Sequence, residues 1–153
     1  TVSDNLIMKN FNSKVFRRWI FQDRAAIRKN ATAKIDQFAI KAGPDGNPVR
    51  YLSGGNIQKV IIARELSEKP AVLVALYPTR GLDIGSAEYV HKVIIDGANQ
   101  GMSTILISED LDELLKLSDE IVVMFRGRLV GCVDPQTTTR EEIGLLMSGE
   151  VQT

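Results

Sequence analysis

Cysteine is almost absent from this sequence, and long apolar runs are absent altogether. Cys132 is the only cysteine and lies in the apolar stretch "RLVGCV", where we expect a small buried residue; no disulfide can form within the chain. No run of about 18 apolar residues predicts a transmembrane helix, and the first residues lack a signal-peptide pattern. We therefore expect a protein of a reducing compartment, cytosolic or attached to a membrane through a partner.

Excess charge of either sign is also missing. The chain contains 19 Lys and Arg residues and 19 Asp and Glu residues, so its formal net charge is zero near neutrality. A chain without excess positive charge has little general attraction for nucleic acid or for an anionic membrane. Composition therefore disfavours nucleic acid as a partner, while 153 residues with a 44% hydrophobic share fit one globular α/β domain.

Hydrophobic spacing divides the chain into a helical first part and an alternating second part. Residues 13–40 carry apolar side chains at helical spacing and predict two helices, broken near residues 21–23. The stretch "KAGPDGNPVRY", residues 41–51, contains two glycines and two prolines and predicts a loop. Beyond it we expect helix 55–68, strand 71–76, helix 85–99, strand 103–107, helix 110–116, strands 119–124 and 127–133, and helix 139–147.

This alternation predicts the α/β fold class. Strands such as "STILI" and "EIVVM" are almost continuously apolar, which is typical of a mainly parallel sheet covered by helices. The last two strands are joined through Arg126 and Gly127 and predict an antiparallel hairpin at one edge of the sheet.

The most distinctive local motif is "LSGGNIQKV", residues 52–60. Ser53 is a good N-cap residue, and Gly54 and Gly55 let backbone amides approach a ligand closely where a helix begins. The free N–H groups and partial positive charge of a helix N-terminus favour anions. The segment is therefore either a phosphate-binding helix start or an ordinary capped helix after a flexible loop.

Two further motifs follow strands. "PTRGLD", residues 78–83, predicts a tight loop in which Asp83 caps the next helix or bonds backbone amides across an interface. "ISEDLDELLKLSD", residues 107–119, places several acids in the first turn of a helix. Those acids fit either favourable placement at a helix N-terminus or a metal site, and the pattern favours the helix terminus.

Together and in this order, the three motifs resemble those of the ATPase subunits of ABC transporters. "LSGGN" with the Gln and Lys that follow is similar to the family's signature motif, "PTRGLD" to its D-loop region, and the end of "ILISED" to its switch region. The set is most similar to importers of simple sugars and nucleosides, and the resemblance covers residues 2–149. It implies a P-loop-NTPase-type fold. Residues 1–69 would form a helical subdomain ending in the signature helix, and residues 70–153 the C-terminal part of the α/β ATPase core.

The same resemblance reveals what is missing. The phosphate-binding pattern G-x-x-x-x-G-K-[ST] does not occur, and the sequence contains no Gly-Lys pair. Leu76 and Tyr77 occupy the positions of the family's Mg²⁺-binding Asp and catalytic Glu, and Glu109 occupies the position of its switch His. Leucine offers no metal ligand, and tyrosine is no base near neutrality because a phenol ionises only at about pH 10. The resemblance therefore implies the C-terminal portion of a second, degenerate ATPase half with no intact catalytic residue.

In this family two halves pack head to tail, and each ATP lies between the phosphate loop of one half and the signature motif of the other. The resemblance implies that the signature residues contact ATP held by the partner half, with Asp83 in the D-loop; these are Ser53, Gly54, Gly55, Asn56 and Gln58. The implied cofactors of the assembled transporter are ATP and Mg²⁺. The implied partners are a second ATPase half, permease subunits and, indirectly, a solute-binding protein, at the cytoplasmic face of the cell membrane.

Two alternatives stay open. One is an ABC-type ATPase that acts on nucleic acid or the ribosome, which the neutral charge disfavours; the other is a non-catalytic dimerising or regulatory module. We also expect the 153 residues alone to hydrolyse no ATP and to rearrange or self-associate. The reason is that the family's strand before the phosphate loop would be absent, which leaves apolar strand edges unpaired.

Overall fold

The computed structural model describes residues 1–43 and 47–149, and the chain divides into two compact units. The first unit comprises Thr1–Leu73 and Pro78–Ser103, and the second comprises Val74–Tyr77 and the residues from Thr104 on. The middle of the predicted loop at residues 41–51 lies outside the described residues. The α/β class is confirmed, because helices alternate with strands after residue 54.

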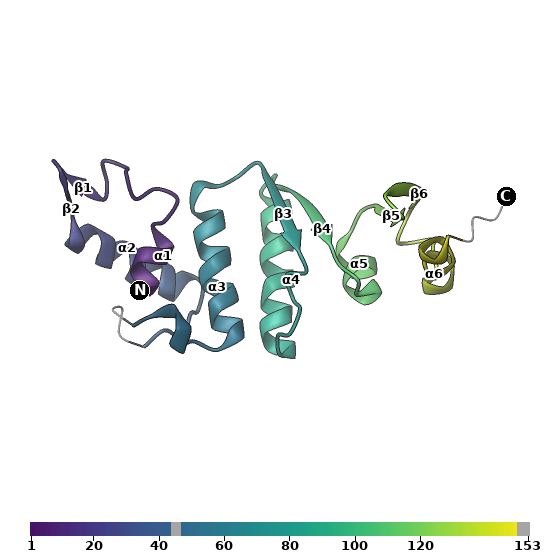
Figure 1. Ribbon diagram of the computed structural model, residues 1–153, viewed down its shortest axis with the longest axis horizontal. Helices are drawn as coiled ribbons and strands as arrows, with labels where there is room; N and C mark the ends of the chain where they lie inside the picture. Colours follow the sequence, from purple (N-terminus) through teal and green to yellow (C-terminus); the bar gives the residue numbers. More distant parts are fainter. Residues whose placement is uncertain (44–46, 150–153) are drawn as a thin grey trace. The chain divides into compact units, whose positions relative to one another are not determined.

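Helices dominate the first unit (Figure 1). They are α1 (Val2–Leu6), α2 (Arg24–Gln37), α3 (Gly54–Glu65) and α4 (Ile84–Asn99), with short 3-10 turns η1 (Val49–Tyr51) and η2 (Leu66–Glu68). α3 and α4 lie side by side and contact each other. One buried apolar cluster joins α1, α2, the segment after α2 and α3; its members are Val2, Leu6, Ala31, Phe38, Ile40, Ala42, Val60 and Ala63.

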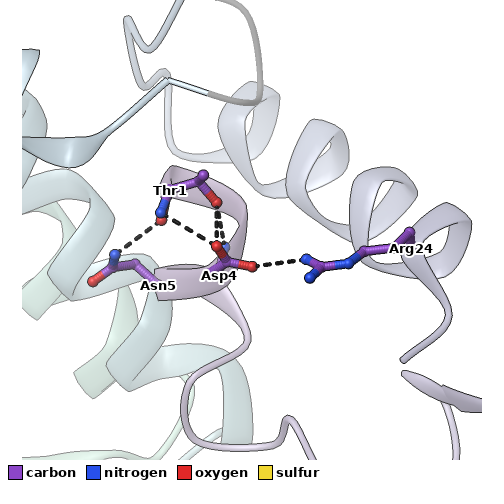
Figure 2. Close-up of polar contacts among 4 residues, drawn as sticks. All are labelled: Thr1, Asp4, Asn5 and Arg24. Carbon is purple, nitrogen blue, oxygen red and sulfur yellow. Dashed lines mark hydrogen bonds and ion pairs between the residues drawn. The ribbon is translucent and has the colours of Figure 1, made fainter. Parts of the chain in front are cut away.

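Polar contacts cap α1 and link it to α2 (Figure 2). Thr1 Oγ1 accepts a hydrogen bond from the Asp4 backbone N–H at 3.2 Å, which together with the Asp4 side chain forms a capping box. Asp4 Oδ1 accepts from Arg24 Nη1, also at 3.2 Å. The Thr1 hydroxyl, more than the other neighbours, holds the pKa of Asp4 below its usual value. Because the Asp4–Arg24 pair is exposed, it contributes at most about 1 kcal/mol.

The prediction of a helix between residue 13 and the break near residues 21–23 is wrong. This segment forms turns and a small antiparallel hairpin of β1 (Arg17–Arg18) and β2 (Phe21–Gln22). Trp19 has a φ of 62°, in the left-handed region that an α-helix excludes. The predicted break itself is confirmed, because α2 begins directly after its N-cap residue Asp23.

Six strands form three two-stranded sheets among the described residues. Besides the β1–β2 hairpin, these pair β3 (Val72–Leu76) with β4 (Ser103–Ile107), and β5 (Ile121–Phe125) with β6 (Arg128–Val133). Backbone bonds join Ser103 N to Ala71 O at the start of the β3–β4 pair and Tyr77 N to Ile107 O at its end. β3 and β4 are therefore parallel, with α4 as the crossover helix. The β5–β6 pair is antiparallel, so the predicted hairpin is confirmed. The predicted mainly parallel sheet with this hairpin at its edge is wrong for the described residues, because β5 and β6 form a sheet of their own and only the β3–β4 pair is parallel.

Two helices cover one face of the β5–β6 hairpin. α5 (Leu111–Leu117) and α6 (Arg140–Ser148) pack on a core of Ile121, Val123 and Ile143. Cys132 pairs with Val122, whose side chain faces outward from that core, so the expectation of a buried cysteine is wrong and its thiol is exposed. No helix within the described ranges is long and apolar enough to cross a bilayer.

Candidate functional site

The start of α3 differs from the starts of the other described α-helices. Ser53 is the N-cap residue by position, but no side chain accepts a hydrogen bond from the first backbone amides of α3 in the described structure. The other α-helices are all capped by a side-chain oxygen, from Thr1, Asp23, Asp83, Asp110 and Thr139. The prediction that Ser53 begins the helix is confirmed, but its hydroxyl does not cap it. The amides at the start of α3 are therefore left for an external acceptor.

The Ser53 hydroxyl is held by Asn56 instead. Asn56 Nδ2 donates to Ser53 Oγ at 2.8 Å, and Asn56 Oδ1 accepts from the backbone N–H of Lys41 at 2.7 Å. The Lys41 bond fixes which end of the amide faces Ser53, because a backbone N–H can only donate. Ser53 Oγ thus accepts one hydrogen bond, and its own proton is available for an acceptor outside the protein.

The two glycines of the LSGGN segment have different environments. Gly54 is exposed, and a Cβ at this position would meet no atom within 4 Å. Gly55 is buried, and a Cβ there would overlap Ser86 Oγ and lie 2.9 Å from Ser86 Cβ. Gly54 therefore leaves open space where an anion would approach, whereas Gly55 permits close packing between the first turns of α3 and α4.

Two contacts connect the start of α3 to the loop before α4. Gln58 Nε2 donates to the Pro78 carbonyl at 3.0 Å. Asp83 caps α4, accepting from Ser86 N at 3.0 Å and from Ser86 Oγ at 2.8 Å. The Ser86 hydroxyl is the main cause of the lowered pKa of Asp83. Of the two predicted roles of Asp83, the structure contains the helix cap.

The end of β3 carries no metal-binding chemistry. Leu76 is 62% exposed and Tyr77 38% exposed, and Tyr77 has a φ of 46° where the strand ends. Tyr77 N donates to Ile107 O at 2.8 Å, which brings the end of β3 beside the end of β4, two residues before the exposed Glu109. No group of three His, Cys, Asp or Glu side chains in the described part of the chain is arranged to hold a metal ion.

The acids after β4 serve the next helix. Asp110 Oδ1 accepts from the backbone N–H groups of Asp112 at 2.9 Å and Glu113 at 3.3 Å, so it caps α5. Ser108 Oγ in turn accepts from Asp110 N at 3.1 Å. The interpretation of this cluster as acids at a helix N-terminus is thereby supported by geometry.

Sequence reasoning missed two residues of this arrangement. Ser86 stands three residues after Asp83, the spacing of an N-cap residue and its first-turn partner, so the pair was detectable from the sequence. The contact of Lys41 with Asn56 spans 15 residues and joins a loop to a helix, and no local pattern indicates it.

Comparisons with known proteins agree with the predicted family. No protein-family model matches the chain. The guanosine import ATP-binding protein NupO of Bacillus subtilis is 38% identical over 99% of this chain and 30% of that protein. The glucose import ATP-binding protein TsgD13 of Haloferax volcanii is 40% identical over 97% of this chain and 28% of that protein. A nucleotide-free ATP-binding cassette from an ABC transporter superposes with a TM-score of 0.69 and 25% identity, covering 97% of this chain and 59% of the cassette.

Over nearly its whole length the chain is similar to ATP-binding proteins of importers, and its fold is similar to that of an ATP-binding cassette from an ABC transporter, so the predicted P-loop-NTPase-type fold is confirmed. The chain spans less than a third of the length of these curated relatives. The correspondence of the LSGGN segment to a signature motif stays a prediction. The division at residues 69 and 70 and the roles of the individual site residues stay predictions.

Proposed function

We propose that this chain is part of the ATP-binding subunit of an importer for simple sugars or nucleosides. In this proposal it supplies its LSGGN segment to ATP bound by a partner ATPase half. The names of the relatives, which include guanosine and glucose import proteins, support the substrate class. The observation that carries the proposal is the uncapped start of α3, beside a Ser53 hydroxyl whose proton is available to an acceptor.

The proposed ligand atoms are the terminal phosphate oxygens of ATP. Toward such an anion, backbone amides and a hydroxyl can act only as hydrogen-bond donors. The partial positive charge at the start of α3 adds to the attraction for the phosphate. Charge-assisted hydrogen bonds contribute about 1.5–3 kcal/mol each, so two or three of them hold two ATPase halves together through one nucleotide. Asn56 and Gln58 then act by positioning Ser53 and Pro78, because their side-chain amides are already engaged within the chain.

The nucleotide site on this half's own core is degenerate in the proposal. Leu76 and Tyr77 stand at the end of β3 and offer no carboxylate, and Glu109, just after β4, belongs to no group of three described residues arranged to hold a metal ion. Loss of a general base alone costs about 10²–10⁴ in rate. ATP and Mg²⁺ are accordingly cofactors of the assembled transporter, with Mg²⁺ held by the partner half.

The proposed division is a helical subdomain over residues 1–69 and the C-terminal part of the ATPase core over residues 70–153. The proposed partners are the second ATPase half, the permease subunits and, indirectly, a solute-binding protein, at the cytoplasmic face of the membrane.

β3 and β4 expose apolar side chains at Val74, Leu76, Ile105 and Ile107. An exposed apolar strand face favours association, so we propose that the 153 residues alone self-associate, which sedimentation equilibrium measures directly.

ATP-driven association with the partner half tests the central claim. Two proteins are mixed. One is the partner half, in which the catalytic Glu is replaced so that ATP is bound but not hydrolysed. The other is the complete ATPase half that contains this chain. ATP is expected to promote association of the parent and of Gln100→Arg, which adds the same charge at the exposed end of α4. Ser53→Arg is expected to abolish the ATP effect. ATP-dependent association of Ser53→Arg equal to that of the parent would refute the proposal.

A further inference from the structure

The β1–β2 hairpin presents an apolar tip to solvent. Trp19 and Ile20 form its two-residue turn, and Phe21 begins the second strand, just before α2 (Figure 1). Their exposed fractions are 84%, 62% and 69%. Three large apolar side chains in succession therefore lie outside every buried cluster of the described structure.

The turn at the tip combines an unusual backbone conformation with an exposed tryptophan. Of the two residues of this turn, Trp19 has a positive φ, of 62°, and the first position of such a two-residue turn ordinarily takes glycine. A bulky residue in the left-handed region is rare, and such outliers concentrate at functional sites. The hairpin thus holds an indole side chain at a position where packing does not require one.

Positive charge surrounds the tip although the whole chain is neutral. The stretch "KVFRRWIF", residues 14–21, contains Lys14, Arg17 and Arg18 and no acid. Within the described residues no carboxylate forms an ion pair with these three cations. The nearest following acid, Asp23, has its carboxylate engaged by the first amides of α2. The hairpin is therefore a local cationic site with an apolar end.

We propose that this hairpin is an anchor that inserts its tip into the interface of an anionic phospholipid bilayer. Tryptophan and neighbouring apolar side chains occupy the boundary between headgroups and acyl chains, while Lys and Arg bind the anionic headgroups beside them. A stable protein–protein contact buries about 800 Å² on each partner, more than three side chains at a hairpin tip supply. The anchor depends only on the hairpin and not on the assignment of the ATP site.

The sequence offers a direct probe, because Trp19 is the only tryptophan in the 153-residue chain. Vesicles of phosphatidylglycerol and phosphatidylcholine in equal parts are expected to shift its fluorescence emission to shorter wavelength. Lipids brominated on the acyl chains are expected to quench it, and added salt to release the chain. Vesicles of phosphatidylcholine alone are expected to cause little change. Light scattering without vesicles monitors self-association of the chain.

Paired variants separate the hairpin from general charge. Arg17→Gln with Arg18→Gln is expected to weaken binding about 25-fold, since each cation near an anionic surface contributes about fivefold. Arg28→Gln with Lys29→Gln removes two exposed cations from α2 and is expected to retain the parent's quenching by brominated lipid. Ile20→Asn is expected to reduce that quenching while circular dichroism stays unchanged.

Three results would overturn the anchor. The first is a Trp19 emission spectrum that does not change when anionic vesicles are added. If purified permease subunits shift that spectrum while the vesicles do not, the tip is a protein contact. The second is equal affinity for anionic and zwitterionic vesicles. The third is equal loss of binding in the hairpin and α2 charge variants, which makes the attraction general rather than local.

Discussion

The first amides of α3 have no side-chain cap, whereas β3 ends in Leu76 and Tyr77 without a carboxylate. At α3 the structure leaves donors available, and it holds the Ser53 hydroxyl so that it can donate as well. At β3 the backbone follows the expected parallel strand, but no side chain there offers a metal ligand. In the proposed assignment, this chain retains the backbone frame of two sites and the chemistry of only one.

The largest expected effect is on the ATPase activity of the assembled transporter, measured after one substitution in each of these two regions. Ser53→Arg is expected to reduce turnover at least about 100-fold, the scale of losing one preorganised donor to a developing anion. Tyr77→Phe keeps the ring and is expected to change turnover less than about twofold, because the proposed function assigns no catalytic role to the phenol. Steady-state phosphate release measures both variants. Full turnover by Ser53→Arg would reverse the assignment of the two regions.

The second prediction asks whether the chain that contains the α3 region can hydrolyse ATP without a partner half. The 153-residue chain is expected to release no phosphate from ATP, because it contains no phosphate-binding Gly-Lys pattern. Adding acids with Leu76→Asp and Tyr77→Glu is expected to leave the chain inactive for the same reason. Phosphate release by the purified parent chain above a heat-denatured control would contradict this prediction.

The third prediction compares the two glycines by stability. Gly55→Ala is expected to lower the free energy of unfolding by about 1–3 kcal/mol, because its Cβ would overlap Ser86 Oγ. Gly54→Ala is the matched control and is expected to be neutral or to gain up to about 1 kcal/mol, since the site is open and alanine favours helix. Urea unfolding followed by circular dichroism measures both. Equal stability of the two variants would show that α3 and α4 do not pack as described.

The sequence allowed prediction of the motifs and of most elements after residue 54, because each rests on a local signal. Strand ends, caps and the β5–β6 turn are of this kind. The segment before α2 failed because its apolar residues at helical spacing include Trp19 and Ile20, which the fold exposes at a hairpin tip rather than buries. Periodicity reports which residues are apolar, and it does not report whether a core exists to receive them.

In the candidate site the predictable part was the location, and the unpredictable part was the hydrogen bonding. Ser53 is a good capping residue by type, yet its hydroxyl accepts from Asn56 instead of from the helix. That outcome depends on Lys41, which reaches Asn56 from a loop distant in sequence and orients its amide. Long-range contacts of this kind follow from the assembled fold and not from local pattern.

The fourth prediction tests whether the orientation of Asn56 matters to the α3 region. Asn56→Asp still accepts from the Lys41 N–H but no longer donates to Ser53 Oγ, so the serine proton turns inward to the new carboxylate. Turnover of the assembled transporter is expected to fall about tenfold, while stability is unchanged or slightly higher because an acid favours a helix N-terminus. Asn12→Asp adds the same charge at an exposed turn and serves as control. Parallel loss of stability and activity in Asn56→Asp would indicate a merely structural role.

The smallest expected effect concerns the cap of α4, the helix against which Gly55 packs. The Ser86 hydroxyl and backbone hold the pKa of Asp83 below its unfolded value of 3.8. A carboxyl whose pKa falls on folding stabilises the native state fully above the unfolded pKa, and that stabilisation is lost as the pH falls through the folded pKa. The stability advantage of the parent over Asp83→Asn is therefore expected near neutrality and is expected to shrink below about pH 4. Unfolding curves for both proteins between acidic and neutral pH measure the difference. A constant difference across that range would mean that the Asp83 cap acts through its geometry and not through its charge.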